Sequence, residues 1–293
     1  MSAEQPSLED LRRRIDEIDT RLHDLLIQRI DVTRRVATAK KGSRTFIRPG
    51  REAQVLRRLV GRHRGPLPKQ VIVRIWRELF AAVTGLQGPL KIAVLADNAN
   101  AGICRLAAEH FGSRTPVRAL GSVAQVLTAV GQEEGTLGVL PLPQDGESDP
   151  WWPNLAGEGE GVPRVIARLP FMEAPADRFG VAGALALGLL DPEDTGCDRS
   201  FLILETEDEL SRGRLRDWLE AAGLTPIDLQ SLQDGAARLL HLIEVEGCFA
   251  TADEALARLR RAGEGALLQV WSVGGYAAPL TAEELATAEE TVL

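Results

Sequence analysis

The sequence predicts a multidomain protein of the α + α/β class. We expect a three-helix module in residues 1–89, a reduced α/β domain in residues 90–198 and a βαββαβ domain in residues 199–293. A length of 293 residues suits two or three domains. Apolar residues recur at helical spacing in the first 90 positions and in short runs later. Charge divides at the same point, because residues 1–90 hold 19 Lys and Arg against 10 Asp and Glu, whereas the remainder holds 15 against 32.

The composition is that of an ordinary globular protein, with 44% hydrophobic and 26% charged residues. No apolar run approaches the ~18–20 residues that span a bilayer. The first residues show no signal-peptide pattern, so we expect a cytoplasmic protein without membrane contact. Cys104, Cys197 and Cys248 are far apart and odd in number, which predicts neither a disulfide framework nor a metal site.

Residues 7–41 are predicted to form one long helix. Its apolar positions follow a heptad spacing at Leu8, Leu11, Ile15, Ile18, Leu22, Leu25, Val32, Val36 and Ala39. Such a helix is about 52 Å long, at a rise of about 1.5 Å per residue. No small domain buries a helix of this length alone, so we expect other helices or a partner subunit against it.

Two shorter helices complete the module. The second is expected from Pro49 to about residue 62, because proline suits the first turn of a helix, and Gly65-Pro66 follows it. The third is expected over residues 68–87, and Gly88-Pro89 ends it. Its apolar face is predicted to comprise Val71, Ile75, Leu79 and Val83.

Short apolar runs alternate with helical patterns after residue 90, which predicts a parallel sheet. The expected strands are 91–95, 117–120 and 137–141, with helices at 101–111 and 122–130. Residues 144–163 have the composition of a loop, and residues 164–190 are expected to form a strand followed by a helix. The last third has the order βαββαβ, which is typical of a ferredoxin-like plait.

A misfit in the first helix points to a binding site. Arg29 occupies a seam position, where a charge is costly unless it is paired. Lys40 lies three turns further along the same face. Arg48, Arg51 and Glu52 share one face of the second helix. Several cations around one acid predict a pocket for a dicarboxylate, because each guanidinium can bind a carboxylate through two parallel hydrogen bonds.

Arg12 cannot reach this pocket within one subunit. It precedes Arg29 by 17 residues, which is about 26 Å along a helix. A functional Arg12 would serve the pocket of a second subunit, which predicts a homodimer with shared sites. The alternative for Arg12 is a solvated helix face. Nucleic acid is not expected as a partner, because the basic module has few aromatic residues and no recognition motif.

The first module resembles the all-helical class of chorismate mutase. The matching stretches are LRRRIDEIDTRLHDLLIQR, VATAKK, RPGREAQVLRRL and RIWRELFAAVTGLQ. The resemblance implies a three-helix, intertwined-dimer fold that converts chorismate to prephenate in aromatic amino-acid biosynthesis. It implies no cofactor and no metal, because a pericyclic rearrangement needs a substrate held in a compact chair and donors at its ether oxygen.

The resemblance also implies roles for individual side chains. Arg29 would bind one substrate carboxylate, and Arg12 of the partner subunit would bind the other. Lys40 and Gln87 would donate hydrogen bonds to the ether oxygen, where negative charge grows as the C–O bond breaks. These are the residues expected to act directly on the reacting atoms.

Four further residues complete the implied site. Glu52 would accept a hydrogen bond from the substrate hydroxyl, and Arg51 would line the site and position its neighbours. Arg48 stands where many members carry a short polar or acidic residue. Val83 stands where well-known members carry a serine that holds a carboxylate, so weaker substrate binding is expected.

Residues 91–280 resemble the prephenate dehydratase and ACT portions of the bifunctional mutase–dehydratase. The matching stretches are LGVLPLPQDG, HLIEVEG and VWSVGGY. We find no Thr-Arg-Phe motif, which supplies the dehydratase's catalytic threonine, so dehydratase activity is expected to be lost. An ACT-like domain is compatible with an amino-acid effector. The alternatives are a fully bifunctional enzyme, a non-catalytic metabolite-sensing dimer and a related lyase that acts on isochorismate.

Overall fold

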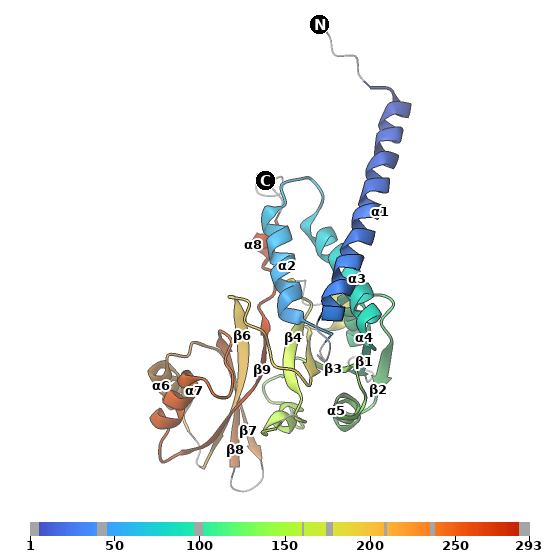
Figure 1. Ribbon diagram of the computed structural model, residues 1–293. Helices are drawn as coiled ribbons and strands as arrows, with labels where there is room; N and C mark the ends of the chain where they lie inside the picture. Colours follow the sequence, from blue (N-terminus) through green and yellow to red (C-terminus); the bar gives the residue numbers. More distant parts are fainter. Residues whose placement is uncertain are drawn as a thin grey trace.

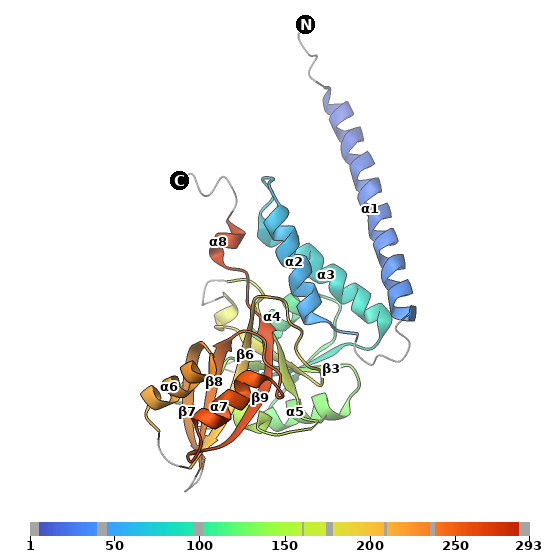
Figure 2. The same ribbon diagram turned by 60° about the vertical axis from the view of Figure 1, so that its left-hand side comes forward.

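A computed structural model describes residues 6–39, 46–96, 102–159, 161–173, 178–207, 210–234 and 238–286. Three helices come first: α1 (Leu8–Ala39), α2 (Pro49–Arg62) and α3 (Lys69–Gln87). Their bounds agree with those predicted from the heptad spacing and from the Pro and Gly breaks. Helix α1 projects from the rest of the chain, whereas α2 and α3 lie against the sheet (Figures 1 and 2).

The heptad seam of α1 is exposed to solvent in the single chain. Leu11 is 45% exposed, Ile15 56% and Leu25 59%. Helix α1 contacts α3, but most of its length extends beyond α3 (Figure 2). A regular apolar stripe of this length on an isolated helix is typical of a surface that packs against another helix.

The buried face of α3 differs from the one expected from its apolar residues. The buried residues are Ile72, Val73, Arg77, Phe80, Val83 and Thr84. Of the predicted face, Val83 is buried but Ile75 is 45% exposed. Helix α3 packs against α1 and α2 as well as α4, so its buried surface is broad. That surface includes one arginine and one threonine, which a search for apolar periodicity passes over.

The rest of the chain forms one nine-stranded sheet with the order β2-β1-β3-β5-β4-β9-β6-β8-β7. The strands are β1 (Lys91–Leu95), β2 (Val117–Leu120), β3 (Thr136–Pro141), β4 (Arg164–Leu169), β5 (Ala184–Gly188), β6 (Asp198–Thr206), β7 (Pro226–Asp234), β8 (Arg238–Glu246) and β9 (Leu267–Ala277). Strand β1 pairs in parallel with β2 and β3, as predicted, and β5 is antiparallel to both of its neighbours. Two short 3₁₀ segments cover Trp152–Leu155 and Arg178–Gly180.

The expectation of a helix within residues 164–190 is wrong. Strand β4 is followed there by β5, and all five residues of β5 are buried. A strand covered on both faces reads as a continuous apolar run, which periodicity cannot distinguish from a buried helix.

The two halves of the sheet join where β4 pairs in parallel with β9. The paired residues are Val165 and Gly274. Gly274 has a φ of 105°, and a Cβ there would collide with the backbone of Val165. A glycine at this position is therefore required for the close approach of the two strands.

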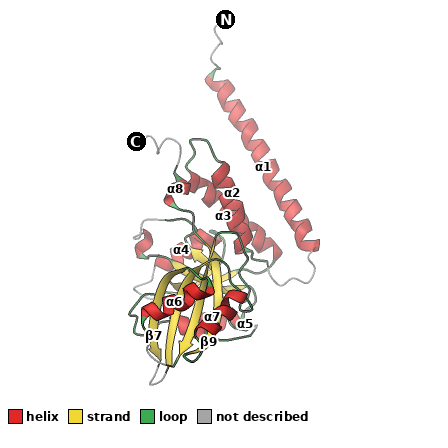
Figure 3. Cartoon of the chain, turned by 90° about the vertical axis from the view of Figure 1, so that its left-hand side faces the viewer, coloured by secondary structure: helices red, strands yellow, loops and turns green. Residues whose placement is uncertain are grey.

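The last third has the predicted order βαββαβ. Strands β9, β6, β8 and β7 are adjacent and antiparallel, and α6 (Arg212–Ala222) and α7 (Glu254–Ala262) cover one face of them (Figure 3). Leu202, Leu215 and Leu256 belong to the cluster between these helices and the strands. Helix α4 (Gly102–Phe111) packs with one buried cluster of the other half of the sheet, and α5 (Val123–Gln132) packs with another.

Helices α2 and α3 share a hydrophobic core with the C-terminal part of the chain. This shared core comprises Ala53, Leu56, Val60, Val73, Phe80, Phe171, Met172, Leu280 and Leu285, the last of which lies in α8 (Ala282–Leu285). Arg57 of α2 adds hydrogen bonds of 2.7 Å to the carbonyl oxygens of Cys197 and Ala278. The second and third helices are therefore fastened to the sheet on the side away from α1. Within the described part of the chain, no helix combines the length and the apolar character needed to span a membrane.

The shared core predicts that α2 and α3 unfold together with the sheet. Leu280 is fully buried in this core. Leu280→Ala should lower the free energy of unfolding by about 2–5 kcal/mol, because it removes buried methyl groups and leaves a cavity. Circular dichroism of the helices and fluorescence of the tryptophans should report one common transition. Leu268→Ala, at a position 43% exposed, is the control and should have little effect. Two separate transitions would contradict a single cooperative unit.

Candidate functional site

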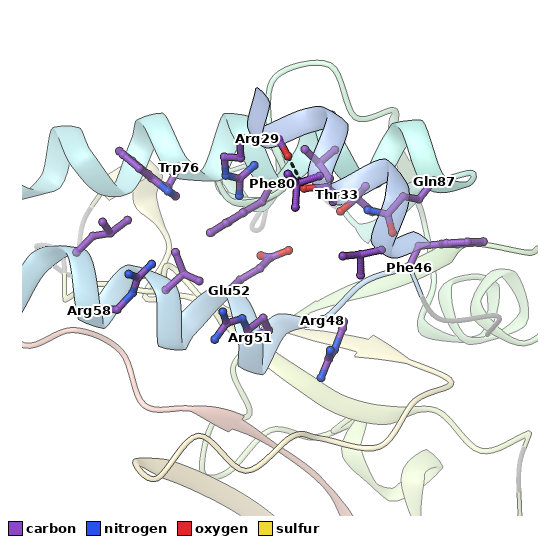
Figure 4. A pocket seen from close by; sticks show the side chains of 16 residues that line it. Arg29, Thr33, Phe46, Arg48, Arg51, Glu52, Arg58, Trp76, Phe80 and Gln87 are labelled. Atoms are coloured by element: carbon purple, nitrogen blue, oxygen red, sulfur yellow. Dashed lines mark hydrogen bonds between the residues drawn. The ribbon is translucent and has the colours of Figure 1, made fainter. Parts of the chain in front are cut away.

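A cavity of about 670 Å³ lies between α1, α2 and α3 (Figure 4). Its size is in the range of small-molecule sites. Six of the residues singled out from the sequence line it: Arg29, Arg48, Arg51, Glu52, Val83 and Gln87. Each of the three helices contributes, so residues up to 58 positions apart in the chain meet at one place.

Arg29 enters the cavity from the seam of α1. The side chain is half-buried, with its guanidinium carbon 5.6 Å from the centre of the Phe80 ring. Its Nη1 atom is buried and has no hydrogen-bond partner among the described residues. Burial lowers the pKa of Arg29, and the nearby Glu52 carboxylate opposes that change. A desolvated guanidinium with an unused donor favours an anionic ligand.

Glu52 reaches the cavity from α2, opposite Arg29 (Figure 4). Its Oε2 accepts a hydrogen bond of 2.8 Å from Nη1 of Arg77 on α3. Burial raises the pKa of Glu52, and so does the negative charge of Glu193, whereas Arg77 and Arg29 lower it. The carboxylate is thus set between two cations on two other helices.

Arg48 and Arg51 lie at the first turn of α2, where a second carboxylate, that of Glu193, joins them. Glu193 accepts a hydrogen bond of 2.7 Å from Nε of Arg48 and one of 3.1 Å from the backbone N–H of Arg51. A carboxylate at a helix N-terminus is stabilised by the helix dipole. Gly50 permits this approach, since a Cβ there would lie 2.6 Å from Cβ of Glu193. Glu193 therefore pairs with part of the positive charge at the rim of the cavity.

The C-terminal end of α3 supplies Val83, Thr84 and Gln87 to the cavity wall. Val83 offers no hydrogen bond, as noted from the sequence. Thr84 also lines the cavity and brings a hydroxyl group to the same wall, although it lies about 100° around the helix from Val83. Thr84 is not among the residues predicted from the sequence, because it lies outside the narrow helix face that carries Val83 and Gln87.

One of the predicted residues that the structure describes does not line this cavity. Arg12 lies on the exposed part of α1 and does not line it, as expected for a residue about 26 Å from Arg29 along the axis. Lys40 lies outside the described residues.

Arg77 and Glu193 are site residues that the sequence analysis missed. A signal for Arg77 exists, because Arg77, Phe80, Thr84 and Gln87 are spaced by three, four and three residues and share one face of α3. No local signal marks Glu193, which comes from the connection between β5 and β6, 142 positions after Arg51.

The described residues contain no group of three or more His, Cys, Asp and Glu side chains placed to hold a metal ion. The cavity instead combines guanidinium groups, one carboxylate, an amide and two hydroxyls, since Thr33 also lines it. This donor set can bind and orient an anion through hydrogen bonds and charge, without a nucleophile.

Comparisons with known proteins match this part of the chain to one family. Residues 11–88 match the model of the chorismate mutase type II family. The bifunctional chorismate mutase/prephenate dehydratase of Pseudomonas aeruginosa is 31% identical over 147 residues, which cover 48% of this chain and 40% of that protein. The protein of the same description from Stutzerimonas stutzeri is 30% identical over 146 residues, with the same coverage. The match thus spans about two fifths of each relative.

Similar solved structures include two prephenate dehydratases and an acylase. Prephenate dehydratase from Streptococcus mutans has a TM-score of 0.44 and 16% identity, covering 65% of this chain and 99% of that one. Prephenate dehydratase from Arthrobacter aurescens in complex with L-Phe has a TM-score of 0.46 and 12% identity, covering 69% and 96%. A quorum-quenching acylase, GqqA, has a TM-score of 0.47 and 17% identity, covering 65% and 96%.

The family match runs from α1 to the end of α3, which are the three helices that enclose the cavity. It includes the positions of Arg12, Arg29, Glu52 and Gln87. The three-helix module of this chain is therefore similar to the chorismate mutase type II family over residues 11–88.

Proposed function

We propose that this chain catalyses the rearrangement of chorismate to prephenate in the cavity between α1, α2 and α3. The observation that carries the proposal is that Arg29 and Glu52 extend into one cavity from opposite sides, within a module that is similar to the chorismate mutase type II family (Figure 4). Chorismate is a dianion with a hydroxyl group and an ether oxygen. A cavity with several arginine cations, one carboxylate acceptor and an amide is complementary to each of these groups.

Each side chain has a defined part in the reaction. Arg29 binds a substrate carboxylate, and Glu52 accepts the hydrogen bond of the substrate hydroxyl. Arg51 lines the site and positions its neighbours. Gln87 donates to the ether oxygen, with Lys40 as the second donor from the residues that follow α1. No covalent intermediate, metal or cofactor is required, because the acceleration comes from orientation and from donors aimed at the growing charge.

The active form in this proposal is a homodimer. The exposed heptad seam of α1 packs against the same seam of a second copy, which closes the open side of the cavity. Arg12 of the partner subunit then supplies a further cation. This arrangement accounts for an arginine on α1 that lies too far from the cavity of its own chain.

The remaining residues have a scaffold or regulatory role in this proposal. We retain the division into residues 1–89, 90–198 and 199–293, with the last as an ACT-like, ferredoxin-like domain and an amino acid as effector. The proposed location is the cytoplasm.

A bifunctional mutase–dehydratase is the second candidate, because the curated relatives carry that description. Formation of phenylpyruvate from prephenate by the full chain would support it. A metabolite-sensing dimer without catalysis would bind chorismate and leave its absorbance unchanged.

Loss of chorismate absorbance in the presence of the full chain tests the main proposal, and Arg29→Ala tests the site. Removing one partner of a desolvated charge pair costs about 2–5 kcal/mol, so kcat/KM should fall at least about 30-fold. Arg62→Ala removes an exposed arginine of α2 that does not line the cavity, and it should retain the wild-type rate. A near wild-type rate for Arg29→Ala would refute the site assignment.

Gln87→Glu should move mutase activity to acid pH. A glutamate at this position can donate to the ether oxygen only when it is protonated, so activity should be present below its pKa and lost above it. The measurement is kcat/KM for chorismate between pH 4 and 9 for both proteins. A profile with the same pH dependence as the wild type would contradict the donor role of Gln87.

Mixing two inactive variants should test the shared site. A dimer of one Arg12→Ala chain and one Arg29→Ala chain contains one site with both arginines and one site with neither. After the chains are unfolded and refolded together, random pairing should restore about one quarter of the wild-type activity. The same variants refolded separately are the control. If the mixture stays inactive, Arg12 does not serve the partner's cavity.

A further inference from the structure

We infer that Arg77 is a positioning residue of the mutase cavity: it fixes the Glu52 carboxylate from below, and Phe171 and His110 of the following α/β part hold Arg77 in place. The inference rests on the proposed function. Nothing in the family match assigns a role to Arg77, which does not line the cavity itself.

Arg77 is buried beneath the cavity. Its side chain is 7% exposed, and its Nη1 donates to Oε2 of Glu52 at 2.8 Å. Its guanidinium carbon lies 5.2 Å from the centre of the Phe171 ring, at a distance typical of a cation–π contact. A planar guanidinium held between a carboxylate and a ring face has little freedom to turn.

The groups around Glu52 explain why Arg77 is needed. Glu52 is faced by Arg29 from α1 and Arg77 from α3, and by a like charge, Glu193, from the connection between β5 and β6. Arg48 and Arg51 precede it on its own helix, and Glu193 is engaged with both. Burial and Glu193 both raise the pKa of Glu52. Arg77, which directly contacts the carboxylate, is the strongest opposing influence and favours its ionised form.

His110 connects Arg77 of the helical module to helix α4 of the α/β part. His110 lies on α4 and is buried, and it lines two small cavities that Arg77 also lines. Burial, and then the charge of Arg77, lower the pKa of His110 well below its usual value, so the imidazole is neutral at physiological pH. A neutral imidazole does not compete with Arg77 for the Glu52 carboxylate.

The geometry leaves one oxygen of Glu52 for the substrate. Oε2 is engaged by Arg77, whereas Oε1 has no hydrogen-bond partner among the described residues. A carboxylate fixed at one oxygen presents the other in a defined direction, which a hydroxyl group of the substrate can meet. Because Phe171 follows β4 and His110 lies on α4, the direction of that oxygen depends on the α/β part of the chain.

The test compares Arg77→Met with Arg74→Met in the full chain. Without Arg77 the pKa of Glu52 rises, so the Glu52 carboxyl group of the variant loses its proton at a higher pH than that of the wild type. For Arg77→Met, kcat/KM at pH 7 should therefore fall by about tenfold or more, the size of effect expected when a charge-assisted hydrogen bond is lost. The acid limb of the pH profile should also move to higher pH. The loss should shrink as the pH rises towards 9. Arg74 lies one turn earlier, is exposed and pairs with Glu109, so Arg74→Met should keep the wild-type profile.

A double variant separates positioning from a merely structural effect. The Glu52→Gln variant has no carboxylate at this position. Adding Arg77→Met to it should therefore leave the dependence of kcat/KM on acid pH the same as in Glu52→Gln alone. Arg77→Lys keeps a cation and should retain an intermediate rate, and it replaces Arg77→Met if thermal unfolding shows that the methionine variant is not folded. Equal loss at every pH, with or without Glu52, would overturn the inference. Absence of turnover in the wild type would instead refute the proposed function.

Discussion

Burial of opposite charges at the floor of the cavity is the constraint on which the arrangement of the three helices depends. The Arg77 side chain is buried and the Glu52 side chain is largely buried, and each charge would be costly without the other. Their pairing requires α2 and α3 to hold one register, because a shift of one turn would separate the two atoms by about 5 Å. A buried ion pair of this kind adds little to stability compared with apolar residues, but it fixes the positions of the two charged groups. A site that binds and orients a dianion needs charged groups in fixed positions.

Helices α2 and α3 also have an apolar face, which packs in the shared core. Leu56 and Val73 pack with Phe171, Met172 and Leu280 in the shared core, on the side of α2 and α3 away from α1. Polar groups that face the cavity and apolar groups that face the sheet are therefore carried by the same few turns. Since side chains in a packed core cannot move independently, the position of the cavity residues is coupled to the end of β4 and to the residues around Leu280.

Much of the helical module can be predicted from sequence, because its signals are local. The heptad spacing and the Pro and Gly breaks give the bounds of α1, α2 and α3, and i,i+3 and i,i+4 spacing groups Arg48, Arg51 and Glu52. What is not predictable is contact between distant segments. Glu193 reaches α2 from a loop more than 140 positions later. Arg77 appears as an interruption of an apolar face, and its pairing with Glu52 is visible only when α2 and α3 are placed side by side.

On helix α1, the exposed apolar seam and the open side of the cavity lie next to each other. Its last turns bring Arg29 to the cavity, whereas its first turns carry an apolar seam and Arg12 into solvent. An exposed apolar stripe carries a free-energy penalty of about 25 cal/mol per Å², so a helix that keeps one over several turns is expected to bury it on association. Val32 and Val36 line the cavity and are also exposed, which means that the cavity is open on the side where the seam lies. In the proposed homodimer, covering the seam and closing the cavity are therefore one event, and Arg12 of the partner subunit adds to the positive charge of the cavity.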